Sequence, residues 1–470
     1  MHRITRSFPG AYIPGRAWRT RLLRPLPAGR LRALLTVLPL LCLALTGHPP
    51  QAGETSLTLT LAEAKELARL QNPGLAVLKA ERERASGTEL RARRAFLPSL
   101  SARLDYLRAD SALLDAVPVP DLAFPPSIAY RDLGPVDAYA SSVQLTQPLV
   151  NLDAWHGHTQ ARHQVAARRF AVSRGVRELG AGVVRAYYGV QTVSERRAAV
   201  AAALAAANAA LELAQAAYDE GLAASVDVYR ARAEAAGRRA QLARARGEVT
   251  AAKARLREIL GVSAGANLVL IDAIPPPEEP SPRAFGRGTR DDIRALERRL
   301  DAAESGVRRA GARFAPRLNL VARQQWLDDD EAFGGDFDGW LVAVTLSWSP
   351  FAGMDQLGQR AEASATRRKA REELRSLRDQ AARERDIARA RWQAAFRAWE
   401  ESSAALKEAR RAVELAEGRY REGVGNMSEL LGAQAALAKA RIERTDARYR
   451  TVLAAEIYRL AAGLPNEEEK

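Results

Sequence analysis

Three of the five histidines lie close together, and histidine is the side chain that most often binds transition metals. They are His156, His158 and His163. On a helix His156 and His163 would share one face while His158 points away, and Asp153 is the only carboxylate near them in the sequence. A zinc site needs at least three converging ligands. We therefore interpret the histidines as a polar collar at a strand-to-helix transition, with metal binding as the alternative.

A second group of possible metal ligands is the acidic run 328–331 (DDDE), followed by Asp336 and Asp338. It lacks the spacing of a Ca²⁺-binding loop, so we predict a solvated loop, with a cation-rich vestibule as the alternative. The sequence contains no P-loop, nucleophile elbow or HExxH motif. We therefore predict no enzymatic activity, no cofactor and no metal.

An internal repeat defines the elements that would position such side chains. The stretch 213–233, LAQAAYDEGLAASVDVYRARA, returns 202 positions later at 415–435 as LAEGRYREGVGNMSELLGAQA. In each copy a glycine follows an apolar-periodic run, which is a usual helix stop, and a serine followed by an acid suits a helix start. Each copy therefore predicts a helix, a short break and a second helix.

Apolar residues recur every seven positions on both sides of these breaks. The first copy has Val176, Val183, Val190, Leu204, Leu211 and Tyr218, with Arg197 as the one gap, then Val228, Ala235, Leu242, Val249 and Leu256; the second has Trp392, Trp399, Leu406, Val413 and Tyr420. A sustained seven-residue period keeps one apolar face against a partner helix, as in a coiled coil. A helix over 156–221 would be about 100 Å long, so we predict two long antiparallel hairpins rather than a globular domain.

Four stretches alternate between apolar and polar residues, at about 98–107, 139–148, 316–327 and 339–349. Their length and alternation match transmembrane β-strands. In the last stretch Trp340 and Trp348 stand at the two ends, where amphipathic rings favour membrane interfaces. The same interfacial position is predicted for Trp326, Tyr106 and Tyr139. The alternative is two soluble hairpins packed on the helices.

Four strands cannot close a barrel by themselves. An open edge in lipid would leave backbone groups unpaired, at a cost of several kcal/mol each. The strands must then be completed by other copies of the chain in an obligate ring. Three copies would supply about 12 strands, although physics alone does not exclude two or four.

The N-terminal segment has the composition of an export signal. The first 53 residues contain eight arginines and no acid, and 33–45 (ALLTVLPLLCLAL) is apolar but too short to span a bilayer. We predict a signal peptide over 1–52, which removes Cys42, the only cysteine. No later run of about 18 apolar residues is seen, so no transmembrane helix is expected. Without the signal the net charge falls from +15 to about +7, and no basic cluster interleaves with aromatics, which excludes nucleic acid as a partner.

The chain resembles the TolC-like outer-membrane efflux proteins over essentially all of its length after the signal. The matching motifs are LTLAEAKELARLQNPGL, AFLPSLSARLDY with its copy ARFAPRLNLVARQ, the strand exits QLTQPLVN and TLSWSPFAG, and the tips YDEGLAASVDV and YREGVGNMSEL. The resemblance implies a mainly α protein with transmembrane β-strands. It further implies a homotrimer with a 12-stranded barrel in the bacterial outer membrane and a helical barrel crossing the periplasm.

The resemblance also implies partners and site residues. The partners would be a periplasmic adaptor (membrane fusion protein) and an inner-membrane transporter of the RND, ABC or MFS type. In the family acidic residues line a periplasmic gate just after the second tip, which maps to Glu429, with Asp227 at the corresponding place in the first hairpin. The family's second acid is matched by Gly432, so a double acidic ring is not expected here. A carboxylate ring would favour cations, whereas the alternative is ordinary helix-start acids.

Adaptor docking is assigned to the tips themselves, with plain turn chemistry as the alternative. The docking candidates are Gly221, Ser225, Gly423 and Ser428.

These expectations define a domain plan. We predict a first repeat over 53–261 with its helical hairpin at 152–261, a connector at 262–290, a second repeat over 291–463 with its hairpin at 352–463, and a tail at 464–470. A helical stretch interrupted at Asn72-Pro73 is expected over 57–94, and a short strand at 267–271. The predicted function is a passive efflux duct. The alternatives are a type I secretion exit for proteins and a periplasmic coiled-coil adaptor without a channel.

Overall fold

A computed structural model describes residues 56–109, 136–221, 223–281, 285–286, 288–328, 333, 337–351 and 353–464. The predicted signal peptide, the tail beyond residue 464 and the acidic positions 329–331 and 336 lie outside the described residues. The two units into which the chain divides are residues 1–55 and 56–470, and only the second is described below.

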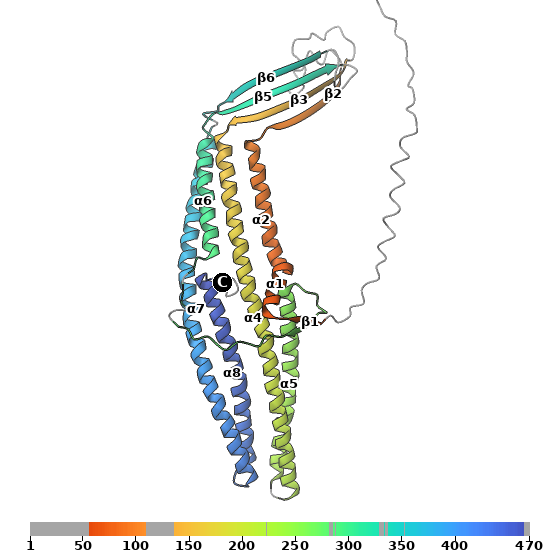
Figure 1. Cartoon of the computed structure of the whole chain (residues 1–470), viewed down its shortest axis with the longest axis vertical. Coiled ribbons are helices and arrows are strands. Elements are labelled where there is room, and N and C mark those ends of the chain that lie inside the picture. Colours follow the sequence, from red (N-terminus) through yellow and green to blue (C-terminus); the bar gives the residue numbers. More distant parts are fainter. Residues whose placement is uncertain are drawn as a thin grey trace, which may run out of the picture. The chain divides into compact units, whose positions relative to one another are not determined.

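Two helical hairpins, each with one long and one shorter arm, form most of the described part of the molecule (Figure 1). They are α4 Leu152–Asp219 with α5 Ser225–Leu260, and α7 Asp355–Arg421 with α8 Met427–Ala462. The breaks contain Gly221 and Gly423 at φ 77° and 73°, a left-handed conformation that other residues rarely adopt. Helices α4 and α7 end 202 positions apart, and helices α5 and α8 begin 202 positions apart. This is the spacing of the internal repeat in the sequence.

The helix starts differ slightly from those predicted. Ser225 is the first residue of α5, preceded by Ala224 with no side-chain cap. In α8 the cap is Asn426, whose Oδ1 accepts from the Glu429 amide at 2.8 Å, and Ser428 is the second helical residue. Asparagine satisfies a free amide of the first turn, which alanine cannot do.

Shorter helices complete the layer beside the two long arms. They are α1 Leu61–Gln71, α2 Pro73–Ala92 and α6 Asp291–Ala312, with a 3₁₀ turn η1 at Arg93–Ala95. Near the strands α2 packs on α4, α4 on α6 and α6 on α7; toward the tips α5 packs on α4, α4 on α8 and α8 on α7 (Figure 1). The long α4 and α7 therefore run through both halves.

Two pairs of helices meet end to end. Asn72, which caps α2, donates from Nδ2 to the carbonyl of Ile259 in the last turn of α5 at 2.9 Å. The amide of Gly288, just before α6, donates to the carbonyl of Ala462 in α8 at 2.9 Å. These bonds satisfy carbonyls that a helix end leaves free.

The predicted helix over 57–94 is wrong at its start. Ser56–Leu59 is a strand, β1, that pairs in parallel with β4 Asn267–Leu270. Helix α1 begins at Leu61 behind a capping box between Thr60 and Glu63. Four residues are too few to separate a helical from a strand period, and the strand partner lies more than 200 residues away.

The four predicted strands form one antiparallel sheet in the order β2-β3-β5-β6. Their bounds are β2 Ser99–Ala109, β3 Val136–Val150, β5 Arg317–Asp328 and β6 Phe337–Ser347. This order matches the helix order α2-α4-α6-α7, so each strand continues the helix beside it in the layer. Within the described part of the chain, the outer edges of β2 and β6 have no strand partner.

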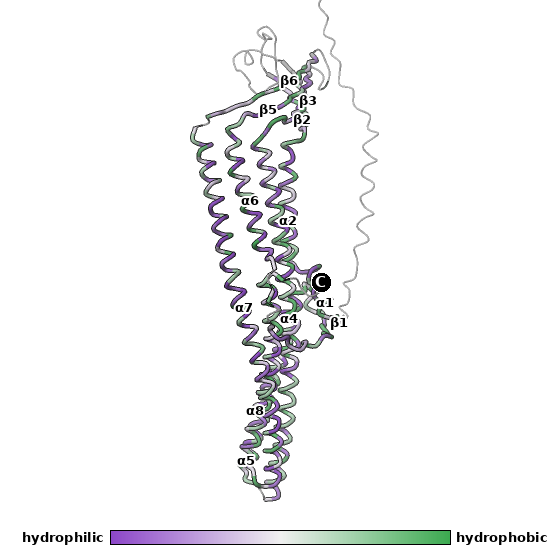
Figure 2. The backbone as a smooth tube through the Cα atoms, turned by 60° about the vertical axis from the view of Figure 1, so that its left-hand side comes forward, coloured by the Kyte–Doolittle hydropathy of each residue, from purple (hydrophilic) through white to green (hydrophobic). Residues whose placement is uncertain are grey.

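The predicted seven-residue pattern forms the contact between the arms. Val183, Val190, Leu256, Trp392 and Leu406 are buried, whereas Tyr218 at the tip is 46% exposed. Figure 2 shows apolar and polar residues interleaved along these helices, as expected for helices with one buried face. Between the arms and β1 a further core surrounds the Tyr187 ring, whose hydroxyl donates to the carbonyl of Leu59 at 2.9 Å.

The expectation of no long apolar helix is corrected by α4. One 18-residue window of this helix has mean hydropathy 1.4, long and apolar enough to cross a membrane by length and composition only. The alanine-rich segment 198–210 raises its hydropathy without adding large side chains. Because α4 packs against α2, α5, α6 and α8, we assign its apolar character to close helix packing.

Candidate functional site

The sheet has one apolar and one polar face. A row across all four strands joins Leu100, Leu145, Ala322 and Val342 on the apolar face. Large apolar side chains on this face are exposed, including Val344 at 62% and Trp340 at 79%. A sheet packed on helices would bury this face, so the alternative of two soluble hairpins covered by the helices is wrong.

The five predicted interface aromatics lie at the two ends of the sheet. Tyr106 and Tyr139 are register partners with ring centroids 5.0 Å apart, near the ends of β2 and β3 that face away from the helices. Trp326 lies near the same end and its ring contacts Phe333 at 5.9 Å. Trp348 lies at the helix end, where Nε1 donates to the carbonyl of Phe314 at 3.0 Å.

Trp340 of β6 and Trp348, the residue after its end, are eight positions apart, which corresponds to about 27 Å of extended chain. That separation is close to the apolar thickness of an outer membrane, about 25 Å. Their placement at the membrane interfaces stays a prediction.

The tips of the two hairpins pack against each other through an apolar cluster. Buried Val228 and Ala231 of α5 contact Met427 and Leu430 of α8, with Ala416 of α7 alongside. The tips of one chain are therefore held together by burial of small and medium apolar side chains, and charged groups surround this cluster.

Both predicted acidic residues lie in the first turns of their helices. Asp227 Oδ1 is 3.6 Å from Nη1 of Arg230 in the same helix. Glu429 Oε1 is 3.5 Å from Nε of Arg419, which belongs to the other arm of its hairpin. Both positions suit the helix-start role, and the lining of a gate stays a prediction.

Tyr420 was predicted only as a member of the seven-residue apolar pattern, but it also has a place in the charge distribution of the tip. Burial raises the pKa of its hydroxyl, and the negative charge of Asp227 raises it further. Asp227 of the first hairpin and Tyr420 of the second are thus electrostatic neighbours. The signal available in the sequence was the repeated tyrosine of YDEG and YREG, whose first copy, Tyr218, is exposed instead.

The four docking candidates are all exposed at the tips: Gly221, Ser225, Gly423 and Ser428. Exposed apolar residues accompany them, namely Val226, Tyr229 and Val424. Apolar side chains exposed beside glycine turns are typical of a surface that binds another protein, and these three were not singled out from the sequence. Adaptor docking stays a prediction.

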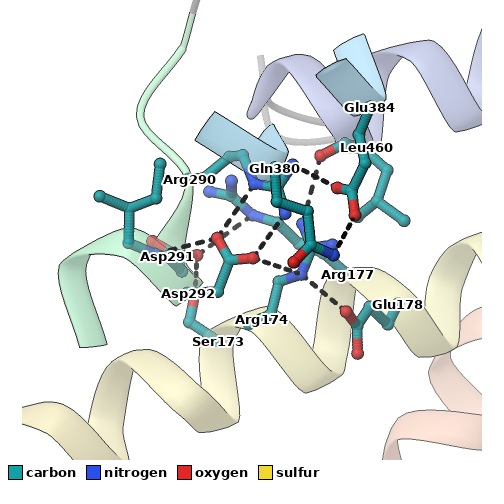
Figure 3. Close-up of polar contacts among 11 residues, drawn as sticks. Ser173, Arg174, Arg177, Glu178, Arg290, Asp291, Asp292, Gln380, Glu384 and Leu460 are labelled. Atoms are coloured by element: carbon teal, nitrogen blue, oxygen red, sulfur yellow. Dashed lines mark hydrogen bonds and ion pairs between the residues drawn. The ribbon is translucent and has the colours of Figure 1, made fainter. Parts of the chain in front are cut away.

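A cluster of charged residues joins four helices where α8 ends and α6 begins (Figure 3). Arg290 is only 6% exposed and binds Asp292 through Nη2 at 2.6 Å and Glu384 of α7 through Nη1 at 2.7 Å. From α4, Ser173 donates to Asp291 at 2.7 Å and Arg174 donates to the carbonyl of Leu460 at 3.2 Å. This cluster ties Arg290, at the end of the connector, to α4, α6, α7 and α8, and it was not predicted from the sequence.

The pKa values in this cluster follow from opposing effects. Burial raises the pKa of Asp292 and of Glu384, but hydrogen bonds from Arg290 and nearby positive charge outweigh burial and leave both pKa values lowered. Burial lowers the pKa of Arg290, but its two carboxylate partners raise it above the ordinary value. All three groups are therefore charged at neutral pH.

The histidines do not converge on one point. His158 Nε2 is 3.7 Å from Glu89 of α2, whereas His163 Nδ1 is 3.7 Å from Asp301 of α6. Among the described residues no group of three or more His, Cys, Asp or Glu side chains is placed to hold a metal ion. His158 and His163 instead lie beside acidic residues of α2 and α6, the helices on either side of α4.

Comparison with known proteins identifies the family. The sequence matches the family model for outer membrane efflux proteins over residues 65–262 and 287–463. The chain therefore belongs to the outer membrane efflux protein family, a family of channels rather than enzymes. A search of curated proteins found no match.

Solved structures share the fold. A membrane protein from Pseudomonas aeruginosa is 22% identical, with a TM-score of 0.73 over 85% of this chain and 93% of that one. The outer membrane protein VceC from Vibrio cholerae is 21% identical, with a TM-score of 0.72 over 86% and 96%. The CmeC outer membrane channel from Campylobacter jejuni is 15% identical, with a TM-score of 0.72 over 89% and 90%.

Proposed function

We propose that this protein is the outer-membrane exit duct of a tripartite efflux pump and conducts substrates passively from the periplasm to the exterior. The observation that carries the proposal is the exposed apolar face of the four-stranded sheet, joined end-on to long paired helices. The apolar face suits contact with lipid, and the polar face suits a water-filled lumen. Membership of the outer membrane efflux family supports the same assignment.

We infer that the duct is a homotrimer. The free edges of β2 and β6 lie on opposite sides of the sheet, so β6 of one copy can pair with β2 of the next. Such a head-to-tail interface closes into a ring. Three copies give about 12 strands, which leaves a lumen wide enough for solutes.

Closure of the duct is assigned to the hairpin tips. The apolar tip cluster, the Arg419–Glu429 pair and the proximity of Asp227 to Tyr420 hold the two hairpins of a copy together. In a ring the three tips would converge, and their carboxylates would favour cations in the narrow opening. Glu429 and Asp227 are the proposed gate residues.

We assign the partners from the exposure of the hairpin tips and from the lack of an energy-supplying motif in the sequence. The exposed tip turns would dock a periplasmic adaptor, and an inner-membrane transporter of the RND, ABC or MFS type would supply energy and select the cargo. A type I secretion exit for proteins uses the same duct with a different transporter. A periplasmic adaptor without a channel is disfavoured because it would not need an exposed apolar sheet.

The test is single-channel recording of the protein in planar bilayers, with its oligomer mass measured in parallel. We expect a trimer with discrete, cation-preferring and mostly low-conductance openings. A non-conducting monomer or dimer that stays soluble without detergent would refute the duct.

Replacing Glu429 with alanine is expected to raise the resting conductance or to lower the preference for cations by about threefold, because one carboxylate per copy is lost near a narrow opening. Glu422→Ala is the matched control, since Glu422 is exposed at the same tip and follows the end of α7. Unchanged conductance and selectivity in Glu429→Ala would remove Glu429 from the gate.

A further inference from the structure

The polar face of the sheet carries an excess of arginine. Arg103 of β2 and Arg323 of β5 lie on this face at neighbouring levels, since Arg103 is opposite Ser142 and Arg323 is opposite Gln144, two positions along β3. Most of the other described side chains on this face are hydroxyl, amide or small groups. Charge on the face is therefore concentrated in the middle of the strands.

Arg323 has no carboxylate partner among the described residues. Its guanidinium donates to the amide oxygen of Gln144 from both Nε, at 2.9 Å, and Nη2, at 2.5 Å, and the side chain is exposed. The amide orients the guanidinium without neutralising it. The remaining N–H donors of Arg323 are free to face water or a passing solute.

The positive charge of Arg103 is only partly neutralised. Its Nε lies 2.8 Å from Asp105 Oδ2 on the same strand, where the arginine side chain is 57% exposed and the aspartate 21%. The arginine of this pair is therefore more exposed to solvent than the aspartate. At the base of the sheet Arg317 is paired with Asp153 of α4 at 3.1 Å, so it adds little net charge.

We propose that Arg103 and Arg323 form a basic girdle around the barrel lumen that favours small anionic organic solutes, such as carboxylates, sulfonates and phosphates. The inference rests on the proposed function, because a lumen exists only if the sheet closes into a ring. Two arginines and one aspartate per copy leave one net positive charge per copy at this level. Guanidinium groups bind carboxylate and phosphate in a bidentate fashion, which gives the girdle chemical selectivity as well as charge.

The expected effect depends on ionic strength. At 0.1 M salt the Debye length is about 10 Å, comparable to the distance from a side chain to a solute in the lumen, so the girdle acts on permeating ions. At 1 M salt the Debye length is about 3 Å, and the effect should be largely screened.

The experiment compares channels in planar bilayers at a tenfold KCl gradient around 0.1 M. All variants carry Asp227→Asn and Glu429→Gln, so that the tips contribute no carboxylate from these two positions. Arg103→Gln with Arg323→Gln is expected to lower the anion-to-cation permeability ratio about threefold or more, and to weaken current block by tripolyphosphate. Arg108→Gln is the matched control, because Arg108 lies on β2 but alternates onto the opposite face.

The outcomes separate the two proposals. Trimeric, conducting variants whose permeability ratio and tripolyphosphate block equal those of the parent would overturn the girdle and leave the duct intact. A parent protein that neither trimerises nor conducts would refute the duct itself. If the double variant assembles poorly, Arg323→Gln alone should give roughly half of the shift, because the hydrogen-bond partner of Arg323, Gln144, is neutral.

Discussion

Arginine in place of Val344 is expected to prevent assembly of the barrel, whereas arginine at the next position, Thr345, is expected to be tolerated. Val344 lies on the apolar face of β6, midway between Trp340 and Trp348 and opposite Leu320, and Thr345 lies on the polar face opposite Asn319. A charge facing lipid near the bilayer midplane costs about 2–4 kcal/mol, and a ring of three copies incurs it three times. An arginine at position 345 would face water instead of lipid.

The measurement is the fraction of protein recovered from outer membranes as a detergent-resistant oligomer. We expect Val344→Arg to be recovered as monomer or degraded, and Thr345→Arg to be recovered as oligomer at the wild-type level. Equal recovery of the two variants would contradict the assignment of the apolar face to lipid. Loss of the oligomer in Thr345→Arg alone would indicate that the assignment of the two faces to lipid and lumen must be reversed.

Methionine in place of Arg290 is expected to destabilise the protein by about 3 kcal/mol, because truncation leaves Asp292 and Glu384 without their buried cation. The loss should be local. Hydrogen exchange is expected to speed up at the end of α8 and the start of α6, while the junction of α5 with α2, held by neutral Asn72, stays protected. Arg298→Met is the control, since its exposed pair with Asp301 should contribute less than about 1 kcal/mol.

Acidification gives a second readout of the same cluster. The pKa values of Asp292 and Glu384 are lowered in the folded protein. Their contribution to the free energy of unfolding is therefore complete above their ordinary pKa values of 3.8 and 4.5, and it is lost as the pH falls through the lowered pKa values. Wild-type protein should therefore lose stability below about pH 4.5 at this junction, and Arg290→Met should lose less on acidification. Equal acid sensitivity in both proteins would show that the cluster does not hold the junction.

Local patterns predicted most of the architecture. The seven-residue period with Gly221 and Gly423 predicted the hairpins, because both signals act within a few turns of one helix. Strict alternation from Trp340 to Trp348 predicted β6 and its exposed apolar face for the same reason. The pairing of β3 with β5, which joins the two halves into one sheet, has no local signal.

The features missed from the sequence depend on contacts between distant segments. Glu384 lies 94 residues from Arg290, and Leu460 lies 286 residues from Arg174, so no spacing rule links them. A signal did exist in the run Arg290-Asp291-Asp292 before a helix, but it was indistinguishable from ordinary helix-start acids. The closeness of Asp227 and Tyr420 likewise follows only from the packing of one tip on the other.

The two free edges of the sheet also determine how a damaged copy affects its neighbours. Because the β2 edge of one chain would pair with the β6 edge of another, every chain in a ring of three completes two others. A chain that keeps both edges but carries a blocked lumen would enter rings beside intact chains. In a cell making equal amounts of both, only about one ring in eight would be free of the damaged chain, so such a substitution would be genetically dominant.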